Sequence, residues 1–176
     1  MSILPIVIAP DPILKLRAVA VEKVDEDIRQ LMSNMLETMY NEPGIGLAAP
    51  QVGQSLRVIV LDISVDPEEK KPLKMANPVI ISASKQKVVH EEGCLSLPQF
   101  YAEVVRPQSV SVKYLNENNE QKELEADGLL STCIQHEIDH LDGVLFVDHI
   151  SSLKRNIILR KLVKYKRNES ILNFQK

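Results

Sequence analysis

Residues 135–143, with the sequence QHEIDHLDG, constrain the fold more than any other part of the chain. In a helix, His136 and His140 lie at positions i and i+4, so both imidazoles project from one face and can bind the same metal ion. Glu137 lies beside them. In this H-E-x-x-H pattern the two histidines hold a divalent metal and the glutamate takes a proton from metal-bound water. The segment therefore predicts a metal-dependent hydrolase.

A solvated helix that carries two histidines by chance is the alternative interpretation. The chain has only four histidines, and two of them fall at the spacing of metal ligands. We therefore favour the metal site.

A catalytic metal site usually has three protein ligands and one open position. The longer form of the motif, H-E-x-x-H-x-x-G-x-x-H, takes its third ligand from a histidine at the position where this chain has Phe146. The only glutamate after the motif that could replace it is Glu169, near the end of the chain. An ion shared by His136 and His140 would lie near the level of residue 138 on the motif helix. Cys133 is five residues before that level, which is ~7.5 Å along the helix axis at ~1.5 Å per residue. A metal–sulfur bond of ~2.3 Å cannot span that distance. Cys94, from elsewhere in the chain, is free to approach, and we predict it as the third ligand.

Residues 44–53, GIGLAAPQVG, superficially match a dinucleotide-binding fingerprint. That fingerprint follows a strand and opens a helix, whereas here a helix precedes and Pro50 interrupts. Two interpretations stay open: a small-residue loop whose backbone approaches a ligand, with Gln51 as an amide donor, or a tight turn packed under a helix.

Apolar periodicity predicts the remaining elements. Asp25 caps an amphipathic helix that ends at Pro43-Gly44, Asp127 caps the motif helix, and Gly143 ends it. Asp11-Pro12 starts a short helical turn, and a last helix runs from about Ser152 to Lys166. Strands are expected at residues 56–62, 78–83, 109–115 and 121–126, and an extended segment at residues 144–150.

Length and cysteine content limit the class of protein. A chain of 176 residues is expected to form one domain over residues 1–176. Two cysteines make no disulfide framework, which favours a reducing, cytoplasmic location. No apolar run is long enough to cross a bilayer, and the start of the chain has no basic region typical of a signal peptide.

Three segments together resemble the signature motifs of the peptide deformylase family, of the Gram-negative bacterial type. They are residues 44–51 (GIGLAAPQ), 92–96 (EGCLS) and 135–143, in this order and spacing. The resemblance covers the whole chain, with no motif position substituted. It implies an α+β fold in which antiparallel β-sheets pack around the central metal-binding helix, with a C-terminal helix.

The resemblance also implies the chemistry of a single site. Metal-bound hydroxide would attack the formyl carbon of formyl-methionyl peptides and release formate, with Glu137 as general base and then general acid. The Gln51 side-chain amide and the Leu95 backbone N–H would face the developing oxyanion. The ligands implied for one divalent ion are Cys94, His136 and His140. Family members natively use Fe(II), and Zn, Ni or Co is possible in isolated protein.

Nascent formyl-methionyl peptides of any sequence are the expected partners, so the substrate is best held through its backbone. We expect Ile45, Gly46 and Gly93 to pair with an extended peptide. Residues expected to line the pocket for the first side chain are Leu129, Thr132 and Cys133, and His90 is a further candidate. For Thr132 and Cys133, ordinary core packing is an equally good interpretation.

The end of the chain is basic, with seven Lys and Arg residues and no acid between residues 154 and 167, although the whole chain has a net charge of −3. A helix over about 152–167 is expected to be a solvated face or to contact ribosomal RNA weakly, as proposed for related enzymes. No DNA or membrane partner is expected. His149 is predicted to be a structural or surface residue, and Arg106 to brace an acidic residue near the site.

Two rival functions remain at this point. The first is a small metalloprotease that cuts internal peptide bonds. The second is a structural zinc module in which Cys133 completes a closed site with the three predicted ligands.

Overall fold

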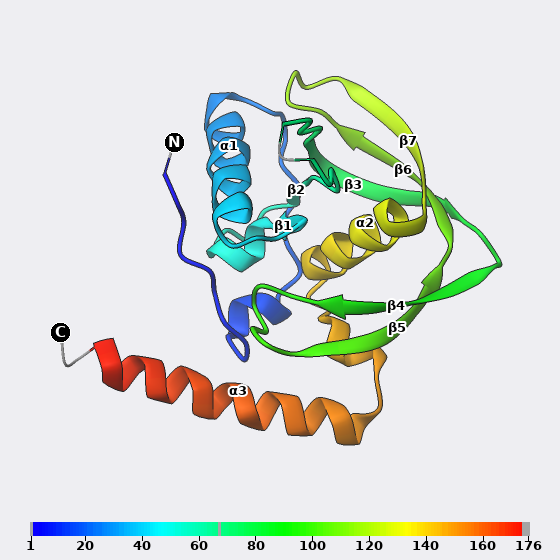
Figure 1. Cartoon of the computed structure of the whole chain (residues 1–176). Helices are drawn as coiled ribbons and strands as arrows, with labels where there is room; N and C mark the ends of the chain where they lie inside the picture. The colour runs from blue at the N-terminus through cyan, green and yellow to red at the C-terminus, as the bar shows by residue number, and fades with distance from the viewer. Residues whose placement is uncertain (1, 67, 174–176) are drawn as a thin grey trace.

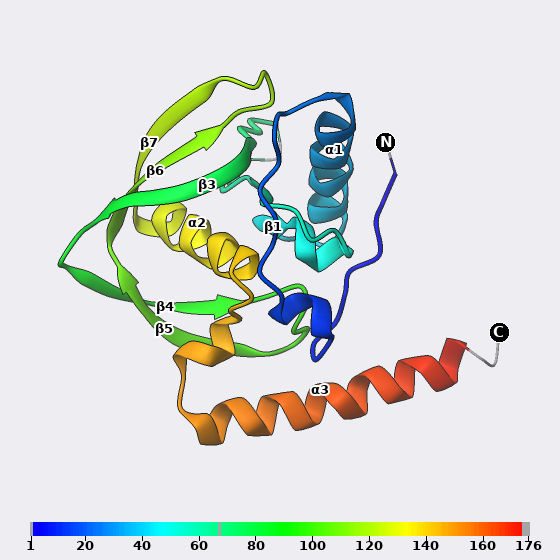
Figure 2. The same cartoon turned by 180° about the vertical axis from the view of Figure 1, so that it is seen from behind.

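The structure is a computed structural model that describes residues 2–66 and 68–173, with side chains as far as Arg167. At its centre lies helix α2 (Gly128–Leu141), with a larger sheet on one side and a two-stranded sheet on the other (Figures 1 and 2). The fold is α+β with antiparallel sheets, as the sequence predicted.

The larger sheet has the strand order β1-β2-β3-β6-β7. Its strands are β1 (Gly46–Ala48), β2 (Val58–Leu61), β3 (Leu73–Ala83), β6 (Ser109–Leu115) and β7 (Gln121–Asp127). The smaller sheet pairs β4 (Lys87–Gly93) with β5 (Tyr101–Pro107). Among the residues that the structure describes, the other helices are α1 (Glu26–Asn41), α3 (Ser152–Asn173) and three short 3-10 helices, η1 (Pro12–Lys15), η2 (Ala49–Val52) and η3 (Phe146–His149).

Helix α2 buries two opposite faces. Ile134, Ile138 and Leu141, at i, i+4 and i+7, pack into the core cluster that covers the larger sheet. His136 is two residues, or about 200°, further around the helix than Ile134, so it projects on the other side. The helix is therefore held by one face while the other remains available for polar chemistry.

The C-terminal end of α2 is pinned from outside the helix. The Leu141 carbonyl accepts a hydrogen bond from the Ala18 N–H, and Arg57 donates to Asp142. Gly143 follows with φ +73°, and a Cβ there would overlap the Lys15 carbonyl. Only glycine both adopts this conformation easily and leaves room for that carbonyl.

Helix α1 confirms the prediction made from its apolar stripe. Asp25 accepts a hydrogen bond from the Ile28 N–H, and Met32, Met35 and Met39 are fully buried against the first two strands. Within the described residues, no helix is long and apolar enough to cross a membrane.

The prediction that residues 144–150 are extended is wrong, because Phe146–His149 form η3. The Asp148 carboxylate accepts from the Leu145 N–H and closes the turn, and Phe146 is buried. Strands β1, β4 and β5 were not predicted, and β3 and α3 are longer than expected. The short strands carry glycine, charged and proline residues that weaken an alternating pattern, and only pairing with their neighbours makes them strands.

Candidate metal centre

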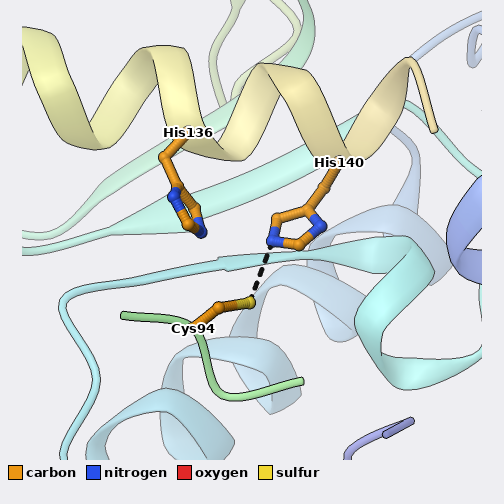
Figure 3. A group of neighbouring side chains, drawn as sticks. All are labelled: Cys94, His136 and His140. Atoms are coloured by element: carbon orange, nitrogen blue, oxygen red, sulfur yellow. Dashed lines mark hydrogen bonds between the residues drawn. The ribbon is translucent and has the colours of Figure 1, made fainter. Parts of the chain in front are cut away.

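Three side chains from two distant segments converge on one point beside α2. Cys94 comes from the turn that follows β4, and His136 and His140 project from α2 toward it (Figure 3). Their ligand atoms all lie within 4.8 Å of one another, and the Cys94 Sγ is 3.3 Å from the His140 Nε2. The structure thus brings together the three residues predicted as metal ligands.

The orientation of the two rings fits a metal ion. The His136 Nδ1 lies 2.8 Å from the Glu92 Oε2, which leaves its Nε2 as the binding nitrogen. The ring planes meet at 73°, so the rings are edge-on to each other. One thiol sulfur and two imidazole nitrogens are a donor set suited to zinc or iron.

Burial acts on the two histidines with different results. It lowers the pKa of His140 well below its ordinary value, so that imidazole stays neutral with a lone pair to offer. Burial lowers the pKa of His136 as well, but hydrogen bonds with Cys94 and Glu92 outweigh it and raise that pKa. A metal ion and a proton therefore compete for the His136 ring.

Glu92 is the buried carboxylate that orients His136. The Arg106 Nε and Nη2 donate to its two oxygens at 2.5 and 2.9 Å, and the Arg106 Nη1 donates to the Asp139 Oδ2 at 2.8 Å. Burial raises the pKa of Glu92, but hydrogen bonds from Arg106 and His136 outweigh it and bring the pKa to about 2. The predicted bracing role of Arg106 near the site agrees with this geometry.

Glu137 differs because its Oε2 is buried without a hydrogen-bond partner. Burial, acting against the nearby His136 charge, raises the pKa of Glu137 to about 7. A Cβ on Gly46 would collide with the Glu137 carboxylate and would lie 2.9 Å from the Cys133 Sγ. Gly46 therefore makes the space that Glu137 occupies.

Comparison with known proteins connects this geometry to a family. The family model for polypeptide deformylase matches residues 3–156. The chain belongs to the polypeptide deformylase family.

Individual deformylases are similar over nearly the full length of the chain. The peptide deformylase of Rhizobium meliloti is 51% identical over 164 residues, which cover 93% of this chain and 94% of that protein. That of Methylocella silvestris is 54% identical over 167 residues, covering 93% and 85%. Among solved structures, the Ehrlichia chaffeensis peptide deformylase in complex with actinonin has a TM-score of 0.91 at 42% identity, covering 95% of this chain and 99% of that one. The family resemblance and the fold predicted from sequence are confirmed.

Hydrogen bonds hold both the oxygen and the nitrogen of the Gln51 side-chain amide. Its Oε1 accepts from the Ala48 N–H at 2.8 Å, and its Nε2 donates to the Ser96 Oγ at 3.2 Å and to the Cys94 Sγ at 3.4 Å. Ser96 is fully buried. No role was predicted for Ser96 or Glu92 from the sequence. Both belong to the EGCLS segment that includes Cys94, and their place in that segment was the signal that could have identified them.

A cavity of about 540 Å³ opens beside the predicted metal ligands. The predicted site residues that line it are Ile45, Gly46, Gln51, His90, Gly93, Cys94, Leu95, Leu129, Thr132, Cys133, His136 and Glu137. All seven residues predicted to contact the substrate backbone or the first side chain are among them.

Cys133 lies apart from the group of ligands found among the described residues. Its Sγ faces the Ile45 carbonyl at 3.6 Å, and burial raises the pKa of the thiol well above its ordinary value. Because metals bind the thiolate, this geometry does not support the closed four-ligand zinc site.

Proposed function

We propose that this chain hydrolyses the N-formyl group from the N-terminal formyl-methionine of newly made proteins and releases formate. The observation that carries the proposal is the convergence of Cys94, His136 and His140 beside the buried Glu137, at the wall of a cavity. Membership of the deformylase family supports the choice of substrate.

Cys94, His136 and His140 would hold one divalent ion, with Fe(II) as the native metal and Zn, Ni or Co as replacements. When bound, the ion would act as a Lewis acid that polarises the formyl group and lowers the pKa of its bound water from ~15.7 to ~7. Glu92 keeps the His136 ring turned toward the ion through the bond to Nδ1.

Glu137 would act as the general base and then the general acid. It follows His136 in α2, and its buried Oε2 has no hydrogen-bond partner, so a lone pair remains to accept a proton. The carboxylate would take the proton from the attacking water and then return it to the leaving nitrogen of the peptide.

Gln51 and Leu95 would stabilise the oxyanion that develops on the formyl oxygen. The Ala48 N–H holds the Gln51 carbonyl, which turns the amide nitrogen toward Cys94. The backbone N–H of Leu95 immediately follows the cysteine ligand. A donor oriented before the reaction is commonly worth ~3 kcal/mol.

The peptide would lie extended between β1 and β4, whose ends line the cavity. Ile45, Gly46 and Gly93 would hydrogen-bond to its backbone, which accepts any sequence. Leu129 and Cys133 would contact the methionine side chain. Residues 1–176 would act as one catalytic domain in the cytoplasm, with α3 making a weak ribosome contact over about residues 152–167.

The decisive experiment measures formate release from formyl-Met-Ala-Ser and cleavage of an unformylated, end-blocked peptide. The proposal expects rapid formate release and no cleavage of the blocked peptide. Internal cleavage without formate release would instead support the metalloprotease alternative.

A further inference from the structure

The short helix η3 contacts α2 at two points. The Phe146 ring stacks on the His136 ring, with centroids 6.4 Å apart and planes at 22°. Three residues later, the His149 Nε2 lies 2.7 Å from the Asp139 Oδ2. Residues i and i+3 of a 3-10 helix eclipse each other, so both side chains leave η3 on the same side. One side of η3 therefore makes both contacts with α2.

A continuous series of hydrogen bonds joins His149 to His136. From Asp139, the Oδ2 accepts the Arg106 Nη1 at 2.8 Å, and Arg106 donates through its other two nitrogens to Glu92. Glu92 is in turn 2.8 Å from the His136 Nδ1. Each member contacts the next directly.

Burial decreases along this series toward His149. Glu92 and Arg106 are buried, whereas the side chains of Asp139 and His149 are 24% and 34% exposed. An ionised carboxylate only accepts hydrogen bonds, so the His149 Nε2 must carry the proton of its bond to Asp139. That N–H holds a partly exposed Asp139 against Arg106, where water would otherwise compete for it.

We propose that His149 is a positioning residue for the metal ligand His136, acting through Asp139, Arg106 and Glu92; this rests on the proposed metal site. Without the His149 N–H, the Asp139 carboxylate can turn to water. The Arg106 Nη1 then loses its acceptor, so only the two bonds to Glu92 fix the guanidinium that orients Glu92. Loss of a group that contacts a ligand directly costs 10–100-fold in metal affinity. His149 acts at longer range, so we expect about 3–10-fold.

The test compares His149→Leu with His149→Gln, whose amide can still donate a hydrogen bond. Zinc affinity of each purified protein is measured by competition with a chromophoric chelator, and kcat and KM are measured on formyl-Met-Ala-Ser. We expect His149→Leu to bind zinc about 3–10-fold more weakly and to lose kcat with KM unchanged. His149→Gln should stay within about twofold of the original chain in both measurements.

A double-mutant cycle with Asp139→Asn checks the route. If His149 acts through Asp139, adding His149→Leu to Asp139→Asn should cost much less zinc affinity than it does alone. Thermal unfolding of the metal-free proteins verifies that every variant folds.

Unchanged zinc affinity in a folded His149→Leu protein would overturn the inference. So would equal losses in the Leu and Gln variants, because they would implicate the shape of the imidazole rather than its N–H. Zinc affinity is measured without any deformylation, so the two proposals fail separately. A chain that binds zinc but releases no formate refutes the proposed function and leaves this inference standing.

Discussion

Glu92 and Glu137 lie in the same buried site, yet their surroundings give them different properties. Arg106 and His136 hold Glu92, and its pKa is about 2, whereas the pKa of Glu137 is about 7 and one of its oxygens has no partner. Two carboxylates whose surroundings separate their pKa values are suited to different tasks. Glu92 orients His136, a proposed metal ligand, and Glu137 is the group proposed to exchange protons.

Glu137→Gln should retain the metal and lose about 10²–10⁴-fold in kcat, because general acid–base catalysis contributes about that much. Metal content of the purified protein and formate release measure the two properties. Cys133→Ala is the matched control for metal binding on the same helix, and it should retain the metal. Loss of metal from the Cys133 variant would revive the closed zinc site.

Gly46→Ala should lower kcat by about 10²-fold, because the new methyl group displaces the Glu137 carboxylate. Gly44→Ala is the control, since the tightest contact of its Cβ would be with the end of the flexible Leu95 side chain at 3.0 Å, and Met39 would lie at an ordinary contact distance of 3.5 Å. Steady-state kinetics on formyl-Met-Ala-Ser compare the two. Similar kcat values for Gly46→Ala and Gly44→Ala would show that the Glu137 carboxylate can move aside without loss of activity.

Asp62 provides a pH-dependent contribution to stability away from the proposed metal ligands. Burial raises its pKa, but hydrogen bonds from Ser64 and Tyr40 outweigh that effect and lower the pKa below the ordinary value. Because the pKa is lower in the folded chain, the stabilisation is present above the unfolded pKa of ~3.9 and is lost as pH falls through the folded pKa. The carboxylate therefore stabilises the fold at neutral pH.

Asp62→Asn should lower the free energy of unfolding by about 1.5–3 kcal/mol at pH 7, the usual value for hydrogen bonds to a charged group. The difference from the original chain should shrink below about pH 4. Urea denaturation from pH 7 to pH 3 tests both expectations. A difference independent of pH would mean that the charge contributes nothing.

Among the elements, the motif helix follows most directly from the sequence. The i, i+4 spacing that places His136 and His140 on one face also places Ile134 and Ile138 on the other. Both faces of α2 could therefore be predicted from the sequence. The C-terminal end of α2 depends on a tertiary contact that the apolar periodicity of the sequence does not predict. Gly143 meets the backbone of Lys15, more than a hundred residues away in the chain.

Gly143→Ala should destabilise the fold more than Gly53→Ala. Both glycines have positive φ, +73° and +79°, so either substitution costs about 1–2 kcal/mol of backbone strain. Only the methyl group at Gly143 also meets backbone atoms, since nothing lies within 4 Å of a Cβ at Gly53. Denaturation midpoints of the two variants give the comparison, and equal shifts would contradict the proposed contact with Lys15.

At the scale of the whole molecule, α3 lies along one side of the body and away from the larger sheet (Figures 1 and 2). Ile158 and Leu162 anchor it in a core cluster with Leu14 and Phe146. Lys161 and Lys164 remain exposed. The basic face is thus held in place by the body and open to a partner.

Lys161→Glu combined with Lys164→Glu should weaken co-sedimentation with ribosomes and reduce its salt dependence, because phosphate contacts release counterions. The same change at Lys85 and Lys87, which are exposed in the β3–β4 region, should have little effect. Equal binding of both double variants at low and moderate salt would exclude a specific role of α3.

The sequence by itself determined the chemistry: two imidazoles one turn apart, one sulfur able to approach them, and an adjacent carboxylate. Such features are local, because helical spacing places side chains without reference to the rest of the chain. Tertiary structure decided which groups support that chemistry. Glu92, Arg106 and Asp139 come from β4, β5 and α2, and their contacts depend on strand pairing and burial. Segments with weak local preference, such as β4, β5 and η3, take their form from those contacts, so no periodicity in the sequence could reveal them.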